Sequence, residues 1–196
     1  MPRTASVTRK TKETDITVEV NLDGSGQSRI NAGIPFFAHM LDHLSRHSLI
    51  DMMVDAKGDL EIDGHHTVED VGLSLGQALT KAFGDKSGMT RYGFASIPMN
   101  EALVDVSLDI SGRPFMVFDA DLPKSKVGEF DSELAEEFLR ALVNAAGLTL
   151  HITVRRGTNL HHVIEAIFKA LARALGDAVR IDPRLAGAVP STKGAL

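Results

Sequence analysis

The chain contains one nine-residue pattern twice, and this internal repeat limits the folds that are open to it. VEVNLDGSG at 18–26 and VDVSLDISG at 104–112 match at six of nine positions, 86 residues apart. Both copies alternate apolar and polar residues and then reach glycine, as expected for a strand that enters a turn. An HHxxE motif also occurs twice, at 65–69 and at 161–165, 96 residues apart. The ordered correspondence predicts a duplicated unit of roughly 90 residues.

Helices and strands are predicted in the same order in each half. The helical stretches are 36–49 and 133–146, the strands after them are 50–56 and 148–154, and the closing helices are 66–83 and 162–180. With the repeated strands, the order is strand, strand, helix, strand, helix, which predicts an α+β fold with helices packed on one face of each sheet. The expected halves, 1–88 and 89–196, form one compact body because Lys86-Ser87-Gly88 is a turn and not a flexible linker.

Composition and charge narrow the range of functions. The 196 residues carry a net charge of −5 and show no basic stripe, so no nucleic-acid partner is expected. The chain has no cysteine, so any metal site must use histidine and carboxylate ligands. It shows neither an apolar run of membrane-spanning length nor the apolar core of a signal peptide, so a cytoplasmic protein without a membrane partner is expected.

Each HHxxE motif offers one pair of metal ligands and one further histidine. On a helix, residues four apart share a face, while the adjacent histidine points about 100° away. Solvated or capping histidines are the alternative for a single copy, but the second copy favours metal binding by Mn²⁺, Fe²⁺, Zn²⁺ or Co²⁺. We therefore expect the motifs to exchange their second histidines between two centres. The predicted groups are His66 with His161 and Glu165, and His162 with His65 and Glu69.

Each centre needs a further ligand, and the helices that precede the motifs supply candidates. His39, His43 and His47 recur every four residues, which suits a metal face, a substrate-facing wall or a polar surface. We favour His39 as a ligand, and Glu137 occupies the comparable place before the second motif. For His43 the alternatives stay open. His151 lies within a predicted strand and is interpreted as structural.

Several polar residues outside the motifs suit an anionic substrate. Two arginines lie at borders between strands and loops, and the segment PSTKG at 190–194 places two hydroxyls beside a lysine. Such groups suit the oxygens of a phosphate, although an ordinary polar terminus is the alternative for the tail. An exposed carboxylate also precedes the first strand. The candidates are Arg91, Arg113, Ser191, Thr192, Lys193 and Glu13.

Over nearly its whole length, the sequence resembles the imidazoleglycerol-phosphate dehydratase family of histidine biosynthesis. The matching segments include RKTKETDITVEVNLDGSG, HMLDH, DGHHTVED, GDKSGMTRYG, SLDISGRP, NLHHVIEAIFKALARAL and PSTKGAL. The resemblance implies a lyase with a duplicated α+β fold, whose halves are like the second domain of ribosomal protein S5. It also implies two Mn²⁺ ions per active site and a homo-oligomeric shell of 24 subunits with active sites between neighbouring subunits.

The resemblance also assigns roles to individual residues. It implies one ion on His39, His66, His161 and Glu165, and a second on His65, Glu69, Glu137 and His162. It implies substrate contacts from Glu13, His39, His43, His47, His65, His66, Arg91, Arg113, His161, His162, Lys169, Ser191, Thr192 and Lys193. Glu13, Glu69 and Glu165 are the expected catalytic carboxylates, with Glu13 as the candidate base. Glu137 stands where the family commonly has histidine and Asn100 where it has aspartate, so we expect altered metal preference and an altered rate or pH dependence.

The implied reaction converts D-erythro-imidazole glycerol phosphate to imidazole acetol phosphate. Ions on both ring nitrogens would lower the pKa of the ring N–H and hold an imidazolate, which expels hydroxide through a diazafulvene-like intermediate. The competing interpretations are a dinuclear metal phosphohydrolase and a non-catalytic assembly protein stabilised by metal ions.

Overall fold

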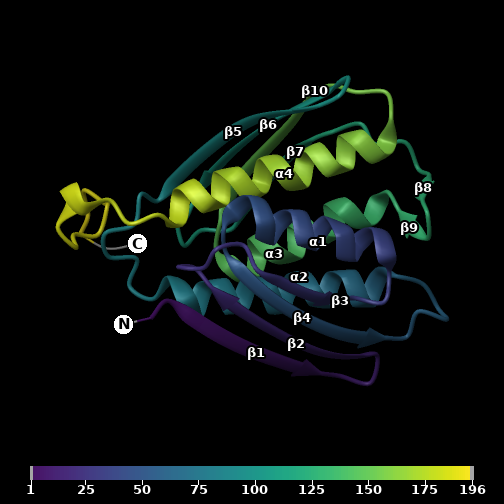
Figure 1. Cartoon of the computed structure of the whole chain (residues 1–196), viewed down its shortest axis with the longest axis horizontal. Helices are drawn as coiled ribbons and strands as arrows, with labels where there is room; N and C mark the ends of the chain where they lie inside the picture. The colour runs from purple at the N-terminus through teal and green to yellow at the C-terminus, as the bar shows by residue number, and fades with distance from the viewer. Residues whose placement is uncertain (1, 195–196) are drawn as a thin grey trace.

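Two four-stranded sheets with the same strand order form the outer layers of the molecule (Figure 1). The structure is a computed structural model, which describes residues 2–194. The first sheet has the order β1 (Thr4–Lys10), β2 (Thr14–Asn21), β4 (Asp51–Gly58), β3 (Ser28–Asn31). The second has the order β5 (Tyr92–Met99), β6 (Ala102–Asp109), β10 (Thr149–Arg156), β7 (Phe115–Asp119). The short strand β3 pairs in parallel with β4, and β7 pairs in parallel with β10. The other strand pairs are antiparallel.

Four long helices fill the layer between the sheets (Figure 1). They are α1 (Pro35–Ser48), α2 (His65–Phe83), α3 (Glu133–Ala146) and α4 (Leu160–Val179). Helix α2 packs on β1 and β2, and α4 packs on β5 and β6. Helix α1 of the first half lies along α4 of the second half, and α3 of the second half lies along α2 of the first. Each helix pair is therefore an interface between the two repeats.

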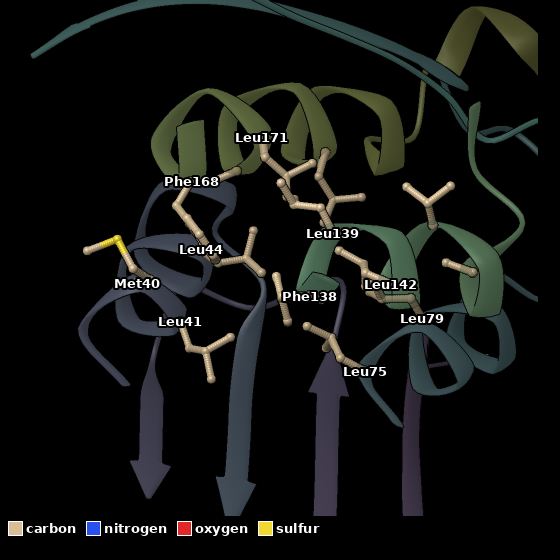
Figure 2. Close-up of a cluster of buried hydrophobic side chains, with 14 of the residues drawn as sticks. Met40, Leu41, Leu44, Leu75, Leu79, Phe138, Leu139, Leu142, Phe168 and Leu171 are labelled. Atoms are coloured by element: carbon tan, nitrogen blue, oxygen red, sulfur yellow. The ribbon is translucent and has the colours of Figure 1, made fainter. Parts of the chain in front are cut away.

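The hydrophobic core lies between these helices and the inner faces of the sheets. Alternation along β2 buries Ile16, Val18 and Val20, as period-two patterning predicts. Figure 2 shows side chains from all four helices meeting at the centre, among them Leu44, Leu75, Phe138 and Phe168. Complete burial of one such side chain contributes about 1.5–3 kcal/mol. The shared core makes the two repeats one body.

The predicted α+β fold, with helices on one face of each sheet, is confirmed, and the long elements begin and end within a few residues of their predicted bounds. No bounds were predicted for the strands β1 and β5, and several shorter elements were not predicted from the sequence. The edge strands β3 and β7 are four and five residues long. A hairpin of β8 (Lys126–Val127) and β9 (Phe130–Asp131) precedes α3, and a 3₁₀ turn, Pro183–Leu185, lies in the tail. Within the described residues, no helix is long and apolar enough to cross a membrane.

Candidate metal centre between helices α1 and α4

Two polar ridges run side by side along α1 and α4. The three regularly spaced histidines of α1 lie on one ridge, and Glu165, Lys169 and Arg173 follow at the same four-residue spacing on α4. The two helices run in the same direction, since His43 lies against Glu165 in the first part of α4, and Ser48, the last residue of α1, lies against Gly176 near the end of α4. The ridges bring donor atoms from the two halves of the repeat together.

His39, His43 and Glu165 form a group that can hold a metal ion. One ligand atom from each lies within 4.8 Å of the others. The Nε2 atoms of His39 and His43 are 3.2 Å apart, and His43 Nε2 is 3.3 Å from Glu165 Oε1. His161 Nε2 is 3.1 Å from Glu165 Oε2, so a third imidazole borders the group. Imidazole nitrogens with a carboxylate oxygen suit divalent transition metals. In residues 2–194 no other three such side chains approach this closely.

The ionisation states at this group match those that metal binding requires. Glu165 is only 4% exposed, and burial raises the pKa of its carboxyl. The Lys169 ammonium, which donates a hydrogen bond to it, and the nearby His43 and His161 outweigh burial, so this pKa lies below its usual value. Burial lowers the pKa of His43 to about 4. At neutral pH the group therefore combines a neutral imidazole with a carboxylate, the forms that bind metal ions.

In the second motif, His162 is held by the turn between β5 and β6. Its Nδ1 lies 2.8 Å from Glu101 Oε2, and its Nε2 lies 3.3 Å from Asn100 Nδ2. The other oxygen of Glu101 accepts the backbone N–H of Thr158 and Asn159, at 3.2 and 2.8 Å. Accepted hydrogen bonds, from Asn159 first and then from His162, lower the pKa of Glu101 to about 2. The carboxylate of Glu101, in the turn between β5 and β6, thus fixes the first turn of α4.

The first motif begins α2 and is held by different residues. The backbone N–H of His65 donates to Asp63 at 2.7 Å. His66 Nδ1 lies 3.0 Å from Asp59, and this hydrogen bond raises the pKa of His66, with the charge of Glu13 acting in the same direction. Glu69 is half-buried on the same helix. Each motif therefore has its second histidine beside a carboxylate.

The chain brings together only part of each predicted ligand set. His39, His161 and Glu165 of the first predicted set lie together, and His43 joins them, whereas His66 lies beside Asp59. The second predicted set, His65, Glu69, Glu137 and His162, is spread over α2, α3 and α4. Among residues 2–194, no hydrogen bond or ion pair joins one HHxxE motif to the other. Their separation was not evident in the sequence, because helical phase gives directions on one helix and not distances between helices.

The predicted phosphate contacts lie at two separate places. Lys169 pairs with Glu165 of the candidate metal centre, and Arg113 is exposed in the loop before β7. Arg91 pairs with Asp109, at 2.7 and 3.1 Å, and donates to the carbonyl of Pro190 at 2.9 Å. It thereby anchors the tail that carries the remaining three candidates, Ser191, Thr192 and Lys193.

This anchor lies far from His161 at the candidate metal centre of the same chain. The backbone N–H of Arg91 donates to Ala178 in the last turn of α4, whereas His161 is in the first turn. At 1.5 Å per residue, the two ends are about 25 Å apart along the helix. The tail and the histidines of the second HHxxE motif are thus held at opposite ends of α4.

Sequence reasoning left His43 open and did not identify Glu101 or Asp59 as partners of the motif histidines. Glu101 and His162 are 61 positions apart, and nothing local links them. The repeat held a signal for Glu101 only, because in both halves the strand before the HHxxE motif pairs antiparallel with a strand that an acidic residue directly precedes. Glu13 and Glu101 each directly precede the second strand of a hairpin.

The fold and the site define an α+β protein of two similarly ordered sheets, with a histidine–carboxylate group between its halves that could hold a metal ion. The model of the family "Imidazoleglycerol-phosphate dehydratase" matches residues 32–175. The chain therefore belongs to the imidazoleglycerol-phosphate dehydratase family, and the predictions of this family and of a dehydratase are confirmed.

Relatives and solved structures agree with this assignment. Imidazoleglycerol-phosphate dehydratases from Symbiobacterium thermophilum and a Jannaschia species are 60% and 58% identical over 194 residues, which cover 99% of this chain and 93% and 100% of theirs. The crystal structure of the Staphylococcus aureus enzyme superposes with a TM-score of 0.83 at 44% identity, covering 91% of this chain and 99% of that one. The crystal structure of the Pyrococcus furiosus enzyme in complex with (S)-C348 also superposes with a TM-score of 0.83. The two chains are 37% identical, and the match covers 97% of this chain and 100% of that one.

Proposed function

We propose that this protein dehydrates imidazole glycerol phosphate to imidazole acetol phosphate in histidine biosynthesis, at active sites completed by neighbouring subunits. The observation that carries the proposal is the group of His39, His43 and Glu165, with Lys169 directly beside it. Imidazole and carboxylate ligands suit metal-assisted chemistry on an imidazole ring, and an adjacent ammonium suits the phosphate of the same substrate. Family membership at 60% identity supports the same reaction.

We propose two Mn²⁺ ions per active site as the cofactors. When bound, such ions would lower the pKa of the N–H of the substrate imidazole and would stabilise negative charge on the ring. For the first ion, the joined side chains His39, His161 and Glu165 support the proposed set, which His66 of another subunit completes. The second set is His65, Glu69, Glu137 and His162. Replacing Glu137 by alanine is expected to remove one ion per chain, and unchanged metal content would exclude Glu137 as a ligand.

The need for neighbouring subunits follows from distances within one chain. The two HHxxE motifs are not joined, and the tail anchor is about 25 Å along α4 from His161. A small phosphorylated imidazole cannot bridge such a gap, so the residues that serve one substrate come from different copies of the chain. A closed homo-oligomer meets this requirement, and the family resemblance suggests 24 subunits.

Mixing two inactive variants tests the shared site. A Glu165→Gln subunit keeps its tail, and a Lys193→Ala subunit keeps its metal ligands. If a site takes these residues from different chains, random co-assembly in equal amounts restores about a quarter of the sites. If both residues come from one chain, every site in the mixture retains one defect and no activity returns. Each variant unfolded and refolded alone is the control.

The side chains of this protein supply binding and proton transfer. Lys169, Arg113 and the tail residues Ser191, Thr192 and Lys193 are proposed to hold the phosphate. Glu13 is proposed as the base that takes the proton from the carbon adjacent to the one that loses its hydroxyl group. Its position supports this role, because Glu13 is exposed in the β1–β2 turn and its charge acts on His66.

A direct assay tests the activity. The Mn²⁺-loaded protein is incubated with imidazole glycerol phosphate, and formation of the enol is followed by its absorbance. Dehydration is expected to stop on removal of the metal by a chelator and to return with added Mn²⁺. Release of inorganic phosphate from simple phosphate esters would instead indicate a dinuclear phosphohydrolase, and metal binding without either reaction would indicate an assembly protein.

A further inference from the structure

Glu101 joins the β5–β6 turn to the start of α4 through both of its carboxylate oxygens. Oε1 accepts the backbone N–H of Asn159 at 2.8 Å and that of Thr158 at 3.2 Å, and Oε2 lies 2.8 Å from His162 Nδ1. An ionised carboxylate can only accept hydrogen bonds, so Nδ1 of His162 must be the donor. The contact therefore places the imidazole proton on Nδ1.

The neighbouring residue indicates the same tautomer from the other side of the ring. Asn100 Nδ2 lies 3.3 Å from His162 Nε2, and an amide nitrogen can only donate. Nε2 therefore accepts, which requires that it carry a lone pair and no proton. Asn100 has φ of 51°, a left-handed conformation that asparagine tolerates better than most residues. The tight turn thus lets two consecutive residues contact opposite nitrogens of one imidazole.

The first repeat has the same arrangement at His66, built from another part of the chain. His66 Nδ1 lies 3.0 and 3.2 Å from the two oxygens of Asp59, which follows β4. In the second repeat the carboxylate comes from the turn between β5 and β6. The carboxylate contact to the second histidine is therefore present in both repeats, although the residue that makes it lies in a different place.

We propose that Glu101 is a positioning residue that holds His162 ready to bind a metal ion through Nε2, and that Asp59 does the same for His66. A carboxylate that accepts from one ring nitrogen fixes the tautomer and orientation of a metal-binding histidine. The inference rests on the proposed function only in taking these two histidines as metal ligands.

Replacing Glu101 by glutamine separates orientation of the ring from anchoring of the helix. The amide oxygen can still accept both backbone N–H groups at Oε1. The amide nitrogen then faces His162 Nδ1 and donates, which moves the ring proton to Nε2 and blocks metal binding there. We expect the Mn²⁺ affinity of the assembled protein to fall by about 10–100-fold. The metal-free variant should unfold at the wild-type temperature, because the backbone contacts remain.

Affinity is measured by titrating metal-free protein with Mn²⁺ and following the electron paramagnetic resonance signal of the free ion. Asp59→Asn is expected to lose affinity in the same way at His66. Asp105→Asn is the matched control, because Asp105 pairs with Arg155 at 2.7 Å and contacts neither motif. Glu101→Ala removes both kinds of contact and should lose affinity and thermal stability together.

Wild-type Mn²⁺ affinity in Glu101→Gln would overturn the proposal. It would also be overturned if Glu101→Gln lost as much thermal stability as Glu101→Ala, because the role of Glu101 would then be structural. A wild-type protein that binds Mn²⁺ without dehydrating the substrate contradicts the proposed function but not the positioning role, since affinity alone is compared.

Discussion

His43 of α1 and Glu165 of α4 face each other across the contact between the two repeats, with His43 Nε2 3.3 Å from Glu165 Oε1. Replacing Glu165 by glutamine removes the negative charge from this centre and leaves the Lys169 ammonium without its partner. We expect Mn²⁺ content and dehydratase activity to fall at least tenfold, and stability to fall by about 1–3 kcal/mol. Metal analysis, the enol assay and denaturant unfolding measure the three effects.

The control for this prediction is Glu136→Gln on α3. Glu136 pairs with Arg140 at the helix surface, and such exposed pairs contribute little to stability. Both its metal content and its activity should match the wild type. Wild-type metal content in Glu165→Gln would show that the group at α1 and α4 is not a metal centre.

Gly72 allows α2 and α3 to approach closely. A Cβ atom added there would lie 2.7 Å from the backbone oxygen of Phe138 and 2.9 Å from Ala141 Cβ, and neither can move without shifting α3. Alanine gains about 1 kcal/mol of helix propensity over glycine. We expect the clash to exceed this gain, so that Gly72→Ala lowers the free energy of unfolding by about 1–3 kcal/mol.

Denaturant unfolding at one fixed protomer concentration measures this difference, because oligomer stability depends on concentration. Gln77→Ala is the control, since Gln77 is exposed on the same helix. It should leave stability unchanged or raise it slightly. If Gly72→Ala were as stable as Gln77→Ala, α2 and α3 would be able to move slightly apart without a loss in the free energy of unfolding.

Local sequence patterns predicted the long elements because their periodicity is read within one segment. The helix 133–146 is found at its predicted bounds, and its four-residue spacing of apolar side chains faces the core. The strand β3, with the sequence SRIN, has no such pattern. It is a strand because β4 offers a free parallel edge, and that partner lies 24 residues further along the chain.

At the candidate site, too, contacts within one helix were predictable from the sequence and contacts between helices were not. The contact between His161 and Glu165 follows from helical geometry and was predicted. The approach of His43 to Glu165 depends on how α1 packs on α4, which no single segment encodes. The distance between the two HHxxE motifs depends on four packed helices, so helical phase predicted the exchange of histidines but not whether one chain could make it.

Asp51 organises the turn between β2 and β3. Its Oδ1 accepts the backbone N–H of Ser25 and of Gln27, each at 2.8 Å. Burial raises the pKa of Asp51, but these accepted hydrogen bonds outweigh it and hold the pKa below its usual value of 3.8. The ionised form is therefore favoured by folding. We expect Asp51→Asn to lower the free energy of unfolding by about 1–2 kcal/mol at neutral pH.

The pH dependence has a definite sign. The contribution of Asp51 is fully present above pH 3.8 and is lost as the pH falls through its lower folded-state pKa. The stability difference between wild type and Asp51→Asn should therefore shrink below pH 3.8. Asp15→Asn on β2 serves as the control, because its pair with Lys10 is exposed. A difference that stayed constant into this acidic range would exclude the charge of Asp51 as its cause.

The guanidinium of Arg91 holds the tail through a planar set of hydrogen bonds that a lysine cannot make. Its guanidinium contacts both oxygens of Asp109 and the carbonyl of Pro190. A lysine ammonium cannot make the planar paired contacts and reach the tail as well. We expect Arg91→Lys to raise KM roughly tenfold with unchanged Mn²⁺ affinity, and to speed tryptic cleavage after Lys193.

Steady-state kinetics and mass spectrometry of the cleaved tail test this prediction together. Arg155→Lys is the matched control, because Arg155 makes an exposed pair with Asp105. It should show the KM and the cleavage rate of the wild type. Unchanged values in Arg91→Lys would show that the tail is held by its other contacts.

Glu13 lies in a turn whose backbone is fixed while its carboxylate is exposed. The backbone N–H of Glu13 donates to Thr11 at 3.0 Å, and its carbonyl accepts from Asp59 at 3.1 Å. Buried Asp70 on α2 accepts from Thr14 at 2.6 Å, which ties the turn to the helix of the first motif. A rigid turn with a free carboxylate is the geometry that a general base requires.

Replacing Glu13 by glutamine keeps the size of the side chain and removes its ability to take a proton. We expect kcat to fall by about 100-fold or more, with Mn²⁺ affinity and unfolding temperature unchanged. Glu19→Gln, on the exposed side of β2, should keep wild-type kcat. If Glu13→Gln retained full turnover, the proton would have to be taken by another group. Loss of Mn²⁺ affinity as large as the loss of kcat in the same variant would instead assign Glu13 to metal binding.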